Sequence, residues 1–259
     1  MTALRTPSFF TGLKPKTIVR SLMGGPAFAR DFFRLKRQRG KDSNFPFGPL
    51  NPITFERCHE SGTMSGHYFH QDLLVARKVF QANPTKHVDI GSRTDGFVAH
   101  VAVFREIEIL DIRAQNSKVR NIHFRQADLM QLQESMRGYC DSISSLHAIE
   151  HFGLGRYGDP IDYAGHNKAI ENITQLLQPG GTFYFSVPIG PQRIEFNAHR
   201  VFSVGYLLKL LGENYDVRSF SYVDDAGDLF EDVGLSSHDV AANFGCRYGC
   251  GIFDLKLKD

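Results

Sequence analysis

The sequence predicts an α/β fold, a doubly wound and mostly parallel seven-stranded sheet with an antiparallel last strand. Three observations support this prediction. Strand and helix patterns alternate between residues 86 and 187, a turn with two glycines follows the first predicted strand, and two further strand patterns lie near the end of the chain. Such alternation implies right-handed crossovers and a buried parallel sheet.

Each predicted element rests on a local pattern. Short apolar runs predict strands at 86–90, 106–111, 121–124, 140–146, 181–187, 215–223 and 250–257. Apolar residues at helical spacing predict helices at 26–38, 68–80, 95–104, 131–137, 163–177 and 203–211. Asn83 and Pro84 end the second helix, and the proline-punctuated segment 44–52 is typical of an extended linker.

The first strand ends in a turn that contains two glycines, within His87-Val-Asp-Ile-Gly91-Ser-Arg-Thr-Asp-Gly96-Phe97. Glycine has no Cβ and tolerates positive φ, so this corner would let a cofactor approach the backbone. The spacing is Asp-x-Gly-x-x-x-Gly, which differs from the Gly-x-Gly-x-x-Gly of most dinucleotide binders. A nicotinamide-dependent dehydrogenase is therefore disfavoured, although it stays open as an alternative.

Acidic residues accompany three successive strands: Asp89 lies in the first, Asp111 ends the second and Asp128 follows the third. The carboxyl ends of parallel strands share one edge of the sheet, so these side chains should converge on one crevice. Asp111, about 20 residues past the glycine turn, is placed to accept both ribose hydroxyls of a nucleoside. Asp128 could accept from an adenine amine, and Asp89 more plausibly orders the glycine turn.

Residues 87–188 resemble class I S-adenosylmethionine-dependent methyltransferases. The resemblance rests on five segments: Asp89-Ile-Gly91-Ser-Arg-Thr-Asp-Gly96, Ile109-Leu-Asp111, Ala127-Asp128-Leu129, Ser145-Leu-His-Ala-Ile-Glu-His151 and Leu176-Leu-Gln-Pro-Gly-Gly-Thr-Phe-Tyr-Phe-Ser-Val-Pro188. It implies a Rossmann-like methyltransferase fold and S-adenosyl-L-methionine as cofactor. More loosely, the whole chain resembles an uncharacterised methyltransferase-like family associated with surface-polysaccharide genes.

The resemblance also implies which residues meet the cofactor. Gly91 and Gly96 would let the backbone meet its methionine part, Asp111 would hold the ribose, and His147 would lie beside the sulfonium. The full set of implied cofactor contacts is Asp89, Gly91, Ser92, Arg93, Gly96, Asp111, Ile112, Asp128, Leu129 and His147. The chain departs from the usual small residues between the glycines, and Arg93 could either reach the cofactor carboxylate or crowd the pocket.

A hydroxyl acceptor of a methyl group needs a base with a pKa near the working pH, which suits histidine. The candidates are His151 and His199, and Glu150 precedes His151 in the sequence. Alternatively, His199 is only a loop residue that hydrogen-bonds to the backbone. Further polar side chains that could bind a sugar or an anionic group are Arg193, Asn197 and Arg200. Tyr68 and Gln71 could close over the cofactor, and the loop 156–160 could shape acceptor choice.

Metal binding is not expected. His147-Ala-Ile-Glu150-His151 spells His-x-x-Glu-His, but zinc binding would need both histidines on one helical face, and a predicted strand directly precedes them. Cys246 and Cys250 flank a glycine-rich turn without enough partners for a metal. With Cys58 and Cys140 they are expected to be reduced cytoplasmic thiols, since the chain holds only 4 cysteines and lacks a Cys-x-x-Cys pair.

Charge divides the chain unevenly. Residues 1–41 hold ten Lys or Arg and one acid, a net +9, so that the remainder carries −7 of the total +2. Phe28, Phe32 and Leu35 place one apolar face on a basic amphipathic helix. This segment could contact an anionic membrane surface or the acidic body of the protein itself, whereas a nucleic-acid partner is not expected.

The predicted organisation is a basic N-terminal extension and linker at 1–50 and a methyltransferase-like domain at 51–259, with core motifs at 87–188 and acceptor-side elements at 189–259. The sequence shows neither the pattern of a secretory signal nor the ~20 apolar residues of a membrane span, so the protein is expected in the cytoplasm, either free or at the inner face of the membrane. The expected activity is O-methylation of a sugar, glycan or other small hydroxyl acceptor. The alternative is a non-catalytic binding or scaffold protein of this fold in surface-glycan biosynthesis.

Overall fold

A computed structural model describes residues 15–41, 44–54, 56, 61–131 and 134–258. The chain divides into two compact units, Met1–Thr63 and Met64–Asp259. Arg5 and Lys14 of the basic segment, and Cys58, lie outside the described residues. The first unit ends at Thr63, beyond the end of the predicted N-terminal extension and linker at residue 50.

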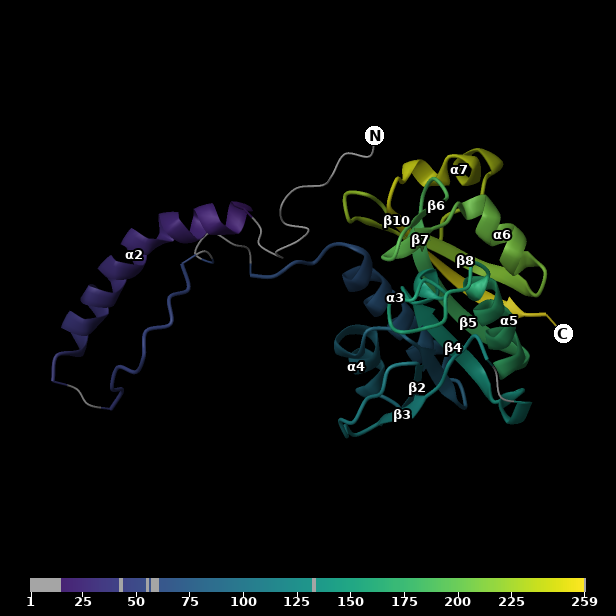
Figure 1. Ribbon diagram of the computed structural model, residues 1–259, viewed down its shortest axis with the longest axis horizontal. Coiled ribbons are helices and arrows are strands. Elements are labelled where there is room, and N and C mark those ends of the chain that lie inside the picture. Colours follow the sequence, from purple (N-terminus) through teal and green to yellow (C-terminus); the bar gives the residue numbers. More distant parts are fainter. Residues whose placement is uncertain (1–14, 42–43, 55, 57–60, 132–133, 259) are drawn as a thin grey trace. The chain divides into compact units, whose positions relative to one another are not determined.

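The first unit contains one long helix, α2 (Pro15–Arg39), which includes the helix predicted at 26–38 and extends it toward the N-terminus (Figure 1). Lys36, Arg37 and Arg39 lie in its last turn, where cations interact favourably with the helix dipole. Phe33 and Leu35 are exposed. Among the described residues, no helix combines the length and apolar character that crossing a membrane requires.

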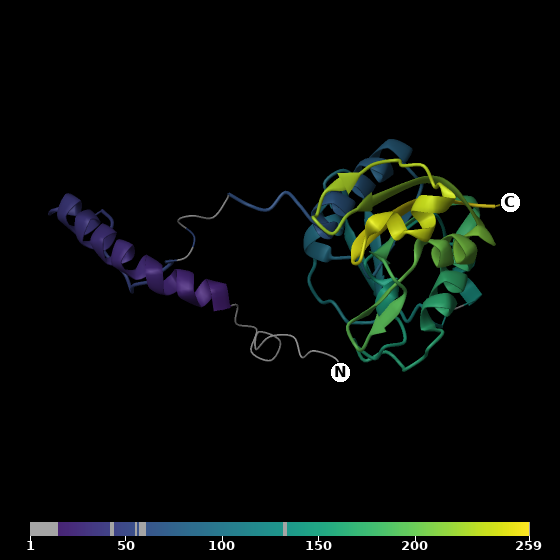
Figure 2. The ribbon, with the colours of Figure 1, turned by 90° about the horizontal axis from the view of Figure 1, so that it is seen from above.

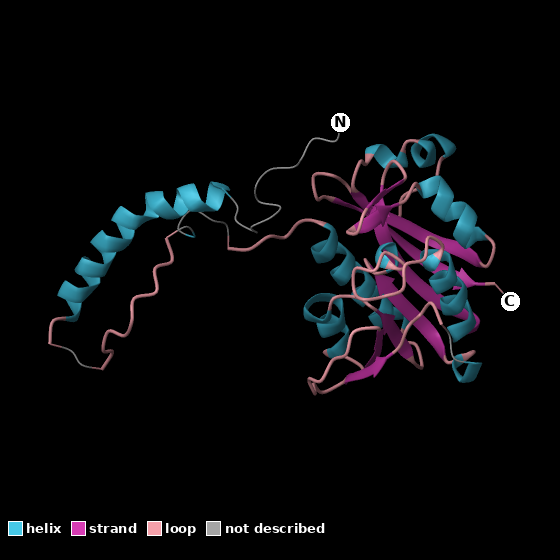
Figure 3. Cartoon of the chain, in the orientation of Figure 1, coloured by secondary structure: helices cyan, strands magenta, loops and turns pink. Residues whose placement is uncertain are grey.

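The second unit is built on an eight-stranded sheet in the order β3-β2-β1-β4-β5-β10-β8-β9 (Figure 3). The first five strands in this order are parallel, and β10 pairs antiparallel with both β5 and β8. The strands of this sheet are β1 (His87–Ile90), β2 (Ile107–Asp111), β3 (Ile122–Gln126), β4 (Cys140–Leu146), β5 (Leu177–Ile189), β8 (Tyr215–Val223), β9 (Leu229–Phe230) and β10 (Gly249–Leu257). The predicted fold class, with its antiparallel last strand, is confirmed, and β9 adds a short edge strand.

Helices cover both faces of the sheet, and the ribbon viewed from two directions shows them on opposite sides (Figures 1 and 2). One face is covered by α3 (His67–Ala82), the π-helical turn η2 (Thr94–Val98) and α4 (Ala99–Ala102). The other is covered by α5 (Gly165–Leu176) and α6 (Val204–Gly212). Each face has its own apolar core, one around Leu74, Val79 and Phe97, the other around Ile170, Leu207 and Phe253.

The remaining elements are short. A separate two-stranded sheet pairs β6 (Arg193–Glu195) with β7 (His199–Val201). The other short helices are η3 (Glu134–Met136), η4 (Ile149–His151), α7 (Ser237–Ala241) and η5 (Asn243–Gly245). Of the helix predicted at 131–137 only the turn η3 is observed among the described residues, and the helix predicted at 95–104 begins as the π-helical turn.

The chain order of the sheet reverses between β1 and β4. From β1 the chain goes outward to β2 and β3, and it then returns to place β4 on the other side of β1. In open α/β sheets the crevice beyond the strands' carboxyl ends at such a reversal is the usual ligand site. Gly91 and His147, which directly follow β1 and β4, have φ of 67° and 51°. Two left-handed residues therefore flank this crevice.

Candidate functional site

Two adjoining cavities open at the carboxyl edge of the sheet. The inner cavity is lined by residues at and after the ends of β1 to β4, among them Gly91, Asp111, Asp128 and His147. The outer cavity is lined by Tyr68, Arg93, Glu150 and His199, among others. Six residues line both cavities: Gly91, Asp111, Arg113, His147, His151 and Tyr157. The crevice predicted from the order of the acidic residues therefore exists.

Asp111 and Asp128 line the same inner cavity, together with Ile112 and Leu129. One oxygen of Asp128 accepts a hydrogen bond of 2.9 Å from the backbone N–H of Met130. Asp111 accepts from Arg113, which donates from its backbone N–H at 2.8 Å and from its guanidinium at 2.6 and 3.0 Å. The guanidinium also lies 4.3 Å from the centre of the Tyr157 ring. Arg113 was not singled out from the sequence, whereas Tyr157 belongs to the loop 156–160 that was expected to shape acceptor choice.

Gly91 provides the close backbone approach expected of the turn. A Cβ there would lie 3.1 Å from the Cβ of Ala148, and its φ of 67° favours glycine. Ser92 is buried, with its backbone and hydroxyl both donating to Asp89. Its hydroxyl oxygen also accepts from the backbone N–H of Leu146, so it ties the turn after β1 to the end of β4.

Asp89 and Gly96 are not among the residues that line the two cavities, which corrects their expected contact with a cofactor. Asp89 is fully buried; its Oδ1 accepts from the hydroxyls of Ser92 and Ser144, and its Oδ2 accepts from the backbone N–H of Ser92. Burial raises its pKa to about 6 although these hydrogen bonds oppose the shift. Gly96 faces Asp72 instead, since a Cβ at Gly96 would lie 2.2 Å from a carboxylate oxygen of Asp72.

Arg93 lies at the outer cavity with its guanidinium bound by Asp95, at 2.9 and 3.1 Å. The same group lies 4.7 Å from the centre of the Tyr68 ring. The side chain is about half exposed, at 47%. Arg93 therefore lines the wall of the outer cavity and leaves the inner one open.

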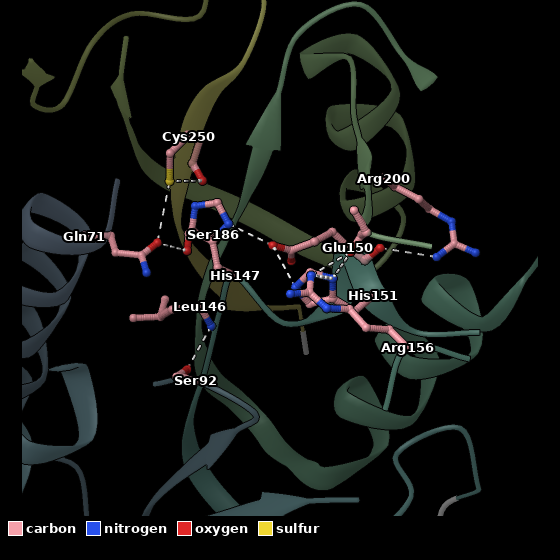
Figure 4. Close-up of polar contacts among 12 residues, drawn as sticks. Gln71, Ser92, Leu146, His147, Glu150, His151, Arg156, Ser186, Arg200 and Cys250 are labelled. Atoms are coloured by element: carbon pink, nitrogen blue, oxygen red, sulfur yellow. Dashed lines mark hydrogen bonds and ion pairs between the residues drawn. The ribbon is translucent and has the colours of Figure 1, made fainter. Parts of the chain in front are cut away.

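Glu150 lies between two histidines: His147, which directly follows β4, and His151, the last residue of η4 (Figure 4). The Nδ1 of His147 donates to Oε1 of Glu150 at 2.8 Å, and the Nε2 of His151 lies 3.7 Å from the same oxygen. Glu150 is only 1% exposed. Burial opposes its ionisation, but the His147 imidazole lowers the pKa of Glu150 below its usual value. The three predicted residues therefore form one hydrogen-bonded and electrostatic group.

His151 has the orientation of a base. Its Nδ1 lies 2.6 Å from the carbonyl oxygen of Ala198, and because a carbonyl can only accept, Nδ1 carries the proton. The lone pair is thus on Nε2, beside Glu150. Burial lowers the pKa of His151, so the ring is neutral near pH 7. His151 lines both cavities, as a group that acts on an acceptor beside the cofactor must.

His199, on β7, lines the outer cavity and lies 3.5 Å from Glu195. Burial also lowers its pKa. Arg200, by contrast, does not reach either cavity, which corrects the expectation that it binds an acceptor. It is 4% exposed, and its guanidinium donates to the backbone carbonyls of Phe152 and Tyr163, so it secures the loop after η4. Arg193 is bound to Glu195.

The His-x-x-Glu-His pattern does not form one helical face. His147 precedes η4 and has a positive φ, whereas His151 ends η4 and turns Nδ1 to Ala198. The structure instead places His147 beside His67 and Cys250, which come from other parts of the second unit. Because neither residue has a local motif, no sequence signal connects them to His147.

Comparisons with known proteins agree with this architecture. The structure is similar to the Burkholderia thailandensis 1,6-didemethyltoxoflavin-N1-methyltransferase, solved with S-adenosylhomocysteine, at 14% identity, a TM-score of 0.51 and coverage of 100% of this chain and 93% of that one. The [4+2]-cyclase SpnF also has a TM-score of 0.51 at 14% identity, with coverage of 73% and 81%. A Haloferax volcanii methyltransferase solved with its Trm112 activator has a TM-score of 0.50 at 14% identity, with coverage of 74% and 90%.

At these identities the solved structures establish the fold, which is that of class I S-adenosylmethionine-dependent methyltransferases. No curated protein is significantly similar to the chain in sequence. A family model described as "Caenorhabditis protein of unknown function, DUF268" matches residues 88–231, more than half of the 259 residues. The chain therefore belongs to the DUF268 family.

Proposed function

We propose that the protein is an S-adenosylmethionine-dependent methyltransferase that O-methylates a sugar, a glycan or another small hydroxyl compound. One observation carries the proposal: Asp111, Asp128 and Gly91 share an inner cavity that adjoins an outer cavity containing His151 and His199. Fold alone is insufficient, since SpnF has this fold and is named a cyclase. The argument therefore depends on the site.

The inner cavity suits a nucleoside cofactor in its donor set, because carboxylates and a glycine turn line it together. Asp111 would accept from the ribose hydroxyls, Asp128 and Leu129 would flank the adenine, and Gly91 would meet the methionine part. Asp111 is bound by the Arg113 side chain, so ribose binding requires that guanidinium to move aside.

When bound, the cofactor supplies a methyl group on a sulfonium, an already activated leaving group. The protein then has to align the acceptor and exclude water, which can lower the barrier by about 7–11 kcal/mol. His151 Nε2, unprotonated near pH 7, would take the acceptor's hydroxyl proton. Glu150, at 3.7 Å, would stabilise the resulting imidazolium. His199 is the second candidate for this proton transfer.

The outer cavity favours a polar acceptor. Polar atoms contribute most of its surface, and Arg93, Arg156 and His199 are among the residues that line it. Hydroxyl-rich molecules such as sugars can use donors and acceptors of this kind. The loose resemblance to a family associated with surface-polysaccharide genes favours a glycan as the methyl acceptor. A non-catalytic binding or scaffold protein in the same process is the alternative.

The experiment is a methyl-transfer assay with labelled S-adenosylmethionine and cell-surface glycan fractions as acceptors. Methyl transfer by the native chain that His151→Gln abolishes, while cofactor binding persists, supports the enzyme. Cofactor binding without transfer to any fraction favours the scaffold alternative. Mass spectrometry of surface glycans from cells without the protein should show loss of one methylene mass per site, and unchanged glycans would exclude this acceptor class.

A further inference from the structure

Three potential metal ligands meet at the wall of the outer cavity. They are His67 at the start of α3, His147 directly after β4, and Cys250 in β10. One ligand atom from each lies within 4.8 Å of the others. His147 and Cys250 are buried and His67 is half-buried. Their positions are far apart in sequence, so the parallel sheet and its antiparallel last strand create this cluster.

His147 is oriented as metal-binding histidines usually are. Its Nδ1 donates to the buried carboxylate of Glu150 at 2.8 Å, which leaves Nε2 as the ring nitrogen that a metal ion could bind. This Nε2 is buried without a hydrogen-bond partner among the described residues. The ring lies between Glu150 and Cys250 (Figure 4). A carboxylate on the other ring nitrogen is the common outer partner of a metal-bound histidine.

The alternative explanation is that His147 is an ordinary packed core histidine. In that case its ring nitrogens should both have hydrogen-bond partners, and the contacts around the cluster do not provide one for Nε2. The rings of His67 and His147 are stacked at 5.1 Å and 7°, an arrangement that leaves Nε2 of His147 unsatisfied. Cys250 Sγ has long contacts of 3.6 Å to Gln71 and 3.9 Å to the Gly251 carbonyl, and its thiol also interacts with the His147 ring. A buried nitrogen without a partner is destabilising, and His147 also holds a φ of 51°.

We propose that His67, His147 and Cys250 bind a borderline-soft divalent ion of the Zn²⁺ class. Two imidazole nitrogens and one thiolate suit this ion, and three protein ligands leave a fourth position open. Tetrahedral zinc would hold the ligand atoms about 3.3–3.6 Å apart, so binding draws the cluster together by roughly an ångström. Of the three ligands, His147 lines the outer cavity, together with Tyr68 and Tyr248.

The first test uses the purified full chain, stripped of metal and titrated anaerobically with Co²⁺ as a spectroscopic probe. One equivalent should give a thiolate-to-cobalt charge-transfer band that Zn²⁺ then bleaches. Cys250→Ser should lose this band, and His147→Gln should weaken Co²⁺ binding by roughly tenfold or more. The matched control is Cys246→Ser, a second buried cysteine four positions away on the other side of a turn, which should keep the band.

A second measurement avoids dependence on variant folding. In the native chain, Zn²⁺ should slow alkylation of Cys250 relative to Cys246, as mass spectrometry of the two cysteines reports. Absence of a thiolate band at one equivalent, or its persistence in Cys250→Ser, overturns the proposal, as does equal alkylation of both cysteines with and without Zn²⁺. Neither assay contains S-adenosylmethionine, so its outcome is independent of the proposed methyl transfer.

Discussion

The guanidinium of Arg113 holds the carboxylate of Asp111 at 2.6 and 3.0 Å, where a cofactor ribose would have to bind. The Arg113 side chain is about half exposed, and it pairs with a residue only two positions away. Because the guanidinium donates to both oxygens of Asp111, it competes with a ribose for them. Because exposed ion pairs contribute about 0.2–1 kcal/mol, the competition should be measurable but modest.

The first prediction is that Arg113→Met tightens binding of S-adenosylhomocysteine by up to about fivefold, the equivalent of about 1 kcal/mol. Isothermal titration of the native and variant chains measures the change. Arg137→Met, an exposed arginine paired with Glu134 away from both cavities, is the matched control and should bind as the native chain does. Weaker binding by Arg113→Met would show that this side chain instead contacts the ligand.

The second prediction concerns the proton acceptor. His151→Gln should lower the turnover number by about 10²–10⁴-fold with little change in cofactor affinity, because Nε2 acts on the acceptor. Since burial lowers the pKa of His151, the native rate should rise with pH through a value below the ordinary 6.5 and level off by pH 7. The variant should lack this rise. A pH profile that His151→Gln leaves unchanged, with an altered profile in His199→Gln, would move the role to His199.

The third prediction concerns stability. Burial raises the pKa of Asp72 to about 6 despite its hydrogen bond from Gln71, so the folded state holds this proton more tightly than the unfolded chain does. The resulting stabilisation is complete below pH 3.8 and is lost as pH rises through about 6. Relative to Asp72→Asn, native stability should fall by about 2–3 kcal/mol between pH 4 and 7.

Urea unfolding of both chains across this pH range measures the difference. Asp216→Asn, at an exposed position of β8, is the control and should track the native chain. A constant difference between Asp72→Asn and the native chain at every pH would mean that Asp72 titrates normally in the folded protein.

The fourth prediction separates the two alternatives for the basic segment. If the amphipathic face of α2 contacts anionic membranes, deletion of residues 1–41 should reduce sedimentation with phosphatidylserine vesicles, and added salt should weaken binding by the full chain. Leu35→Ser should act in the same direction, since this side chain lies on that face and is exposed. Equal sedimentation of the full and truncated chains would leave membrane contact without support and favour contact with the protein itself.

Much of the fold could be predicted because burial is uniform along its central strands. Every residue of His87–Ile90 is buried, and so is every residue of β5 from Phe183 to its end at Ile189. The hairpin of β6 and β7 was not predicted, because strands of three residues are too short to show a periodic pattern. The Pro-Gly-Gly turn also became part of β5, where a register irregularity accommodates it.

The site was predictable where chain position alone decides proximity. Strand order brings Asp111, Asp128 and Gly91 to one edge, so their convergence follows from the alternation pattern. Long-range contacts gave no such signal: Arg200 is buried by carbonyls of the loop 152–163, and Asp72 occupies the space beside Gly96. His67 and Cys250 reach His147 only through the folded sheet, and their residue types alone suggest no connection.

The most direct measurement is isothermal titration of S-adenosylmethionine into the native chain and into Asp111→Asn, with Glu134→Gln as an exposed control. We expect saturable binding at one site per chain, unchanged in the control and weakened at least about tenfold when the carboxylate is lost, as for a hydrogen bond to a charged group. Heat that does not saturate in the native chain, or equal affinity in Asp111→Asn, would contradict a nucleoside pocket at this edge of the sheet.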